Sequence, residues 1–130
     1  MAERVPYAYA ALQVVPSIER GERINVGVVL HARAKRFLAV RIAVDETRLH
    51  LLAPNLDRDS VRAMLDSIQL VAEGDPRGGE IALLPAPERF GWITAPASTV
   101  VQPGPVHGGA TDDPARELEQ LFRRLVITAE

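Results

Sequence analysis

The sequence predicts one α+β domain: an antiparallel sheet of about four strands, in the order β-β-β-α-α-β-α, with helices packed on one face. Residues 5–43 contain runs of alternating apolar and polar side chains, which is typical of strands. Residues 57–73 and 113–126 instead repeat their apolar side chains every three to four positions, as helices do. Only short links join the first three strands, and the 130 residues correspond to a single domain spanning 1–130.

Three strands are expected in the first third of the chain. They are residues 5–15, 23–31 and 36–43. Simple alternation divides the second strand into two faces, one with Ile24, Val26, Val28 and Leu30 and the other with Asn25, Gly27, Val29 and His31. An antiparallel meander of this kind commonly buries one face and leaves the other in water.

Helices follow these strands. A short helix is expected from Asp45 to Leu52, and a longer one from Asp57 to Glu73. Asp57 is a typical N-terminal cap because its carboxylate accepts hydrogen bonds from the free amides of the first turn. Gly74 stands where a left-handed residue commonly ends a helix.

The last third of the chain alternates between helix and irregular structure. A short helix is expected at residues 85–93, with Trp92 in the core. Residues 99–102 form the expected fourth strand, which Val106 and His107 continue after a proline kink. A final helix starts at Asp113 and Pro114, since proline is well tolerated in the first helical turn.

Composition excludes several classes of function. The absence of cysteine excludes disulfides, thiol catalysis and cysteine-bound metal. A net charge of −2 argues against a dedicated nucleic-acid binder. No long apolar run or signal-like start is present, so we expect a cytoplasmic protein that does not bind membranes. His31, His50 and His107 lack paired ligands at metal-site spacing, so no metal or cofactor is expected.

Gln13, Asn25 and Arg41 are the first candidate site residues, because they interrupt otherwise apolar strands. A register that aligns them would create a hydrogen-bonded patch on the sheet. The alternative is a polar face that is simply hydrated, as in many antiparallel sheets.

A second candidate is the turn that contains Glu19, Arg20 and Glu22. Acid–base catalysis needs a carboxyl group whose pKa is shifted by its surroundings. An exposed turn would not provide such surroundings, so a local ion pair is the simpler interpretation.

The third candidate is the glycine- and proline-rich segment 98–109, which contains Ser98, Gln102 and His107. Glycine lets a backbone approach a ligand closely, and histidine titrates near neutral pH. Ser98, His107 and Asp112 contain the side chains of a catalytic triad, but the sequence lacks a nucleophile-elbow motif. Two roles remain open for His107: pinning the segment to the sheet, or contacting a ligand or partner.

Several blocks together resemble one bacterial family, catalogued as domain of unknown function 3037. The similarity extends over about residues 5–126. The blocks include the 7–16 strand, Glu19 to Glu22, 25–30, 88–92, 98–102, 105–107 and Asp113-Pro114. Asn25, Gln102 and His107 fall inside these blocks. No accepted activity follows from the resemblance. It implies a protein partner, because members are often encoded beside kinase-like proteins.

Two functions therefore compete at this point. The first is a non-enzymatic binding or accessory module for a protein partner, with a kinase-like protein as one candidate. The alternative is a small-molecule-binding or hydrolytic domain with a polar site between the sheet and the 98–109 loop. Pairing of two copies through a sheet edge, as a homodimer, is compatible with either function.

Overall fold

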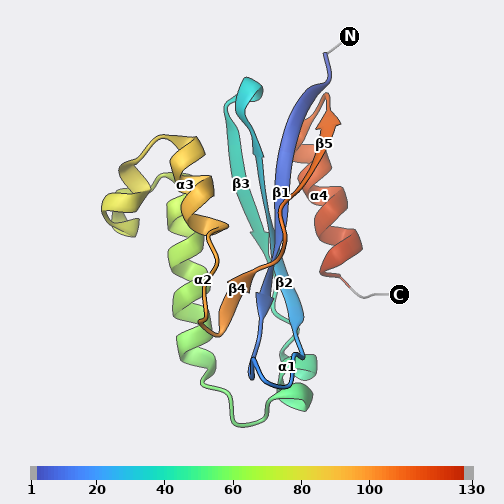
Figure 1. Ribbon diagram of the computed structural model, residues 1–130, viewed down its shortest axis with the longest axis vertical. Helices are drawn as coiled ribbons and strands as arrows, with labels where there is room; N and C mark the ends of the chain where they lie inside the picture. Colours follow the sequence, from blue (N-terminus) through green and yellow to red (C-terminus); the bar gives the residue numbers. More distant parts are fainter. Residues whose placement is uncertain (1–2, 128–130) are drawn as a thin grey trace.

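A five-stranded antiparallel sheet lies at the centre of the molecule (Figure 1). The structure is a computed structural model, and it describes residues 3–127. One side of β1 pairs with β2, which pairs with β3, and the other side pairs with β4 and β5 in succession. The strands are β1 Val5–Val14, β2 Ile24–Ala32, β3 Phe37–Ile42, β4 Val101–Pro103 and β5 His107–Thr111. The α+β class is confirmed, and the expected interrupted fourth strand is the pair β4 and β5.

The helices begin and end close to the expected residues. The α-helices are α1 Glu46–Leu52, α2 Arg58–Glu73, α3 Ala86–Ile93 and α4 Pro114–Leu125. Short 3-10 helices are η1 Arg33–Lys35, η2 Pro76–Gly78 and η3 Glu80–Leu83. Asp57 and Asp113 accept hydrogen bonds from the third residue after each, so both act as the N-terminal caps of α2 and α4.

Helices cover both faces of the sheet, which corrects the expectation that they pack on one face. In Figure 1, α2 and α3 lie on one side of the strands and α4 lies on the other. Two separate apolar clusters match these two sides, one beneath α2 and α3 and one beneath α4. The physical reason is that β2 buries apolar side chains on both of its faces, and each face needs a cover.

A β-bulge in β2 explains why simple alternation assigned its faces wrongly. Leu12 lies opposite Gly27 while Gln13 lies opposite Asn25, so Val26 is an extra residue in β2. The four apolar residues expected on one face of β2 are therefore divided between its two faces at the bulge. Ile24 and Val26 pack in the α2 cluster, whereas Val28 and Leu30 pack in the α4 cluster.

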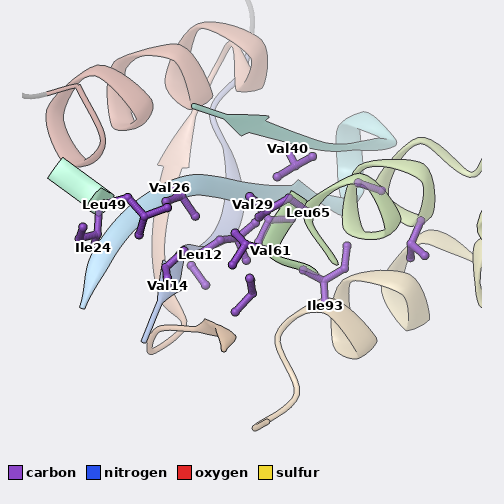
Figure 2. Packing of buried hydrophobic residues seen from close by; sticks show 14 of the residues in the cluster. Leu12, Val14, Ile24, Val26, Val29, Val40, Leu49, Val61, Leu65 and Ile93 are labelled. Carbon is purple, nitrogen blue, oxygen red and sulfur yellow. The ribbon is translucent and has the colours of Figure 1, made fainter. Parts of the chain in front are cut away.

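The larger core lies between the sheet and α2. Figure 2 shows side chains from β1, β2 and β3 meeting residues of α1, α2 and α3 in this layer. Leu12, Val26 and Val29 are fully buried there, and Val61 and Leu65 of α2 are nearly so. Ile93 of α3 belongs to the same layer, and Phe90 packs against it.

Candidate functional site

Gln13 and Asn25 are brought together by the register of β1 and β2. Gln13 Nε2 donates to Asn25 Oδ1 at 3.0 Å, and Arg23 Nη1 donates to Gln13 Oε1 at 3.1 Å. Asn25 Nδ2 donates to the carbonyl oxygen of Leu125 at 3.0 Å. The two amides therefore attach the last turn of α4 to the sheet.

Arg41 does not join that amide pair, although it faces the same side of the sheet. It lies on β3, where its Nε is 3.2 Å from Glu119 Oε1. Its guanidinium also lies 4.6 Å from the centroid of the Phe122 ring, in cation–π geometry. Both partners belong to α4, so the side chain contributes to helix packing.

The turn at Glu19, Arg20 and Glu22 is exposed. Arg20 Nε lies 2.7 Å from Glu22 Oε1. This hydrogen bond lowers the pKa of Glu22, although partial desolvation opposes the shift. A general acid that works near neutral pH needs the opposite shift. The geometry of this turn matches a local ion pair.

The three candidate residues of segment 98–109 lie apart from one another in the structure. Gln102 lies opposite Gln13 in the register, and its Nε2 donates to the carbonyl oxygen of Thr99 at 2.8 Å. His107 lies opposite Tyr9, with the two ring centroids 5.4 Å apart. Ser98 is exposed and precedes β4.

A catalytic triad of Ser98, His107 and Asp112 is not assembled. His107 begins β5 and Asp112 follows its end, a separation of roughly 16 Å along an extended strand. The carboxylate of Asp112 instead pairs with Arg116 at 3.1 Å.

A pocket lined mainly by apolar side chains lies on the α2 side of the sheet, beside the β4 edge. Its volume is about 360 Å³. Leu12 and Val101 line it from the sheet, Met64 and Ile68 from α2, and Trp92 from α3. Residues 95–97 and Thr99 also contribute to its wall. None of the lining side chains is titratable, so the pocket has the composition of a binding site for uncharged groups.

Trp92 was expected in the core, and this expectation is wrong. Trp92 is 44% exposed and lines the pocket. Helical periodicity over 85–93 did not reveal this, because the α3 helix is short and few of its positions are buried. The sequence did contain one indication of the pocket. The single tryptophan of the chain, Trp92, stands shortly before Pro96 and Ala97, which also line the pocket.

Two half-buried side chains that lie outside the pocket, Tyr7 and His31, have shifted pKa values. Burial, together with a hydrogen bond of 3.0 Å to Glu117 Oε2, raises the pKa of Tyr7 to about 12. Burial also lowers the pKa of His31, with smaller contributions from Arg33 and Arg89. The His31 ring packs on Phe90 with centroids 5.3 Å apart. Neither group lines the pocket.

The described residues contain neither a metal-binding cluster nor a helix that could span a membrane. Among residues 3–127, no group of three or more His, Asp or Glu side chains is arranged to hold a metal ion. Within the same range, no helix has the length and apolar character needed to cross a bilayer.

Comparison with known proteins places the chain in a family. A family model described as protein of unknown function (DUF3037) matches residues 9–126, which is most of the chain. No curated protein and no solved structure gives a significant match. The chain therefore belongs to the family described as protein of unknown function (DUF3037).

Proposed function

We propose that this protein is a non-enzymatic binding or accessory module that docks a protein partner through the η3–α3 unit, residues 80–93. The supporting observation is a concentration of exposed apolar side chains there. Leu83 is 66% exposed, Leu84 is 38% exposed and Trp92 is 44% exposed. Exposed apolar patches are typical of protein interaction sites.

Trp92 has the properties of an interface anchor. Tryptophan is among the residues that contribute most to binding energy when a partner covers them. Gly91 beside it is exposed, and a Cβ built there meets no atom within 4 Å. A glycine that the fold does not require lets a partner approach the α3 backbone closely.

The distribution of charged groups supports binding rather than catalysis. The pocket beside Trp92 has no titratable lining side chain. Glu22 forms an ion pair with Arg20, and Asp112 forms one with Arg116. The hydrogen bond from Arg20 lowers the pKa of Glu22, so this carboxylate is held in its charged form rather than prepared for proton transfer.

A kinase-like protein is the first partner to test, on the basis of the family resemblance. The experiment cross-links tagged protein in its host, identifies recovered proteins by mass spectrometry, and then reconstitutes the candidate complex from purified components. Supporting evidence is a measured Kd for the purified pair that depends on the η3–α3 unit.

Two variants make this test specific. Leu83→Ser with Trp92→Ser removes the proposed anchors, and Leu51→Ser serves as the matched control. Leu51 is 77% exposed but lies on α1, outside the η3–α3 unit. Loss of an aromatic anchor costs about 2 kcal/mol or more, so we expect Kd to rise at least ~30-fold for the double variant only. An equal loss in Leu51→Ser, or no loss in the double variant, contradicts the proposal.

A small-molecule or hydrolytic domain with a polar site between the sheet and the 98–109 loop is the second candidate. It receives less support, because its residues lie on different surfaces. Gln102 lines the pocket, whereas Asn25 and Arg41 face α4, and His107 packs on Tyr9. Homodimer formation is a further proposal, since β3 is an outer strand of the sheet and no strand within residues 3–127 pairs with its outer edge.

A further inference from the structure

The pocket beside Trp92 has features that a protein-docking surface does not require. Its floor is formed by Leu12, which is fully buried, and Val101, which is 4% exposed. Both residues belong to the main apolar core. The pocket is therefore a recess that reaches down to the core layer between α2 and the β4 edge.

The size of the recess points to a compact organic molecule. Its volume is about 360 Å³. A cavity of roughly 150 Å³ accommodates benzene, and small-molecule pockets commonly measure about 300–1,000 Å³. The recess therefore has room for a ligand of more than one ring.

Charge and hydrogen bonding define the ligand further. Because no titratable side chain lines the recess, an ionised ligand would lose hydration without gaining a charged partner. Gln102 Nε2 donates one of its two N–H groups to the carbonyl oxygen of Thr99, and the amide oxygen of Gln102 can accept a hydrogen bond from a ligand. Ser67 adds a hydroxyl to the wall from α2.

We propose that this recess is a binding site for a neutral, largely apolar small molecule with more than one ring and a hydrogen-bond donor. The wall includes Met64, whose flexible thioether adapts to ligands of different shape. Trp92 lines the recess and is partly exposed, so its indole ring is available to stack on a flat ligand. The site needs no protein partner, so this inference does not depend on the proposed docking function.

Trp92 is the only tryptophan of the chain, so its fluorescence reports directly on the recess. Purified full-length protein is titrated with N-phenyl-1-naphthylamine, a neutral polycyclic probe. We expect a saturable fall in tryptophan emission with a matching rise in probe emission, at one probe per chain. A response that stays linear up to the solubility limit overturns the proposal.

Two substitutions on α2 locate the probe. Ser67→Phe fills the recess, and Asp66→Phe places the same side chain at an exposed position that does not line it. We expect at least a tenfold rise in the probe Kd for Ser67→Phe and less than a twofold change for Asp66→Phe. Equal effects of the two variants place the probe elsewhere and overturn the proposal.

Competition tests the chemistry of the ligand without relying on Ser67→Phe folding correctly. Neutral 2-naphthol is expected to displace the probe at lower concentration than naphthalene, which lacks a donor, or 2-naphthoate, which is charged. In Gln102→Leu the advantage of naphthol over naphthalene is expected to disappear. Displacement by naphthoate as readily as by naphthol overturns the assignment of a neutral ligand. These measurements use the isolated chain, so their failure is distinct from a failure to bind a protein partner.

Discussion

Substitution of Gly109 by alanine tests a close contact between β1 and β5. Gly109 lies opposite Tyr7 in the sheet register. A Cβ at position 109 would lie 2.6 Å from Tyr7 Oη and 2.7 Å from Tyr7 Cζ. The ring lies against this glycine and reaches Glu117 on α4, to which its hydroxyl donates at 3.0 Å. Gly109→Ala therefore requires the ring to move and lose that hydrogen bond.

The expected destabilisation follows from three contributions. Forcing extra volume into a well-packed core costs about 1–3 kcal/mol, and the lower end applies here because Gly109 is exposed. Loss of a hydrogen bond to a charged group costs about 1.5–3 kcal/mol, and the lower end applies because Tyr7 is partly exposed. Replacing glycine by alanine also lowers the conformational entropy of the unfolded chain, which raises the free energy of unfolding by about 0.4–1 kcal/mol. We expect the free energy of unfolding to fall by about 2 kcal/mol, measured by urea denaturation and far-ultraviolet circular dichroism.

Gly108→Ala is the matched control on the same strand. A Cβ there meets only the carbonyl oxygen of Tyr7, at 3.5 Å, which is ordinary contact. Its stability should change by less than about 0.5 kcal/mol. In a Tyr7→Ala background, the effect of Gly109→Ala should disappear, because the clash is removed. Equal stability of the two alanine variants, or an unchanged loss without Tyr7, refutes the reasoning.

Three further predictions concern backbone packing and titration. Gly27→Ala should lower the free energy of unfolding by about 1–3 kcal/mol, because its Cβ would lie 2.9 Å from the backbone oxygen of Arg41 on β3. A variant that is as stable in urea as the wild type contradicts this prediction. Gly91→Ala should raise that free energy by about 0.5–1 kcal/mol, since this α3 position is surrounded by open space; a lower thermal midpoint contradicts this. Tyr7, with its pKa raised to about 12, should stabilise the fold below pH ~10, and this contribution should be lost as pH rises from 10 through 12. Absorbance at about 295 nm in a Tyr9→Phe background measures this titration, and a midpoint at the ordinary tyrosine pKa of ~10 contradicts it.

The candidate polar residues show how far side-chain patterns predict a site. Polar interruptions in apolar strands correctly drew attention to Gln13 and Asn25, which form a hydrogen bond in the structure. The same argument could not tell a ligand site from an internal attachment. That distinction depends on α4, whose Leu125 carbonyl accepts from Asn25 and whose Glu119 pairs with Arg41. No local pattern indicates where a helix one hundred residues away along the chain will pack.

The recess beside Trp92 was missed for a related reason. Leu12, Met64, Trp92 and Val101 come from four separate segments of the chain. Each of these side chains, taken alone, is an ordinary apolar residue expected in the core. A pocket depends on the volume left between elements after they pack. The sequence of any one element does not predict that volume.

Local sequence patterns were enough to predict the individual helices and strands and the α+β class. The signals were strong because each one acts within a few residues: Asp57 and Asp113 cap helices, Gly74 ends one in a left-handed conformation, and apolar side chains recur at helical or strand spacing. The face that each strand residue occupies and the positions of the helices depend on packing between distant segments of the chain. The physical reason is that one extra residue at Val26 reverses the alternation of β2. Both faces of the sheet then carry apolar side chains, so α2 and α3 cover one and α4 covers the other.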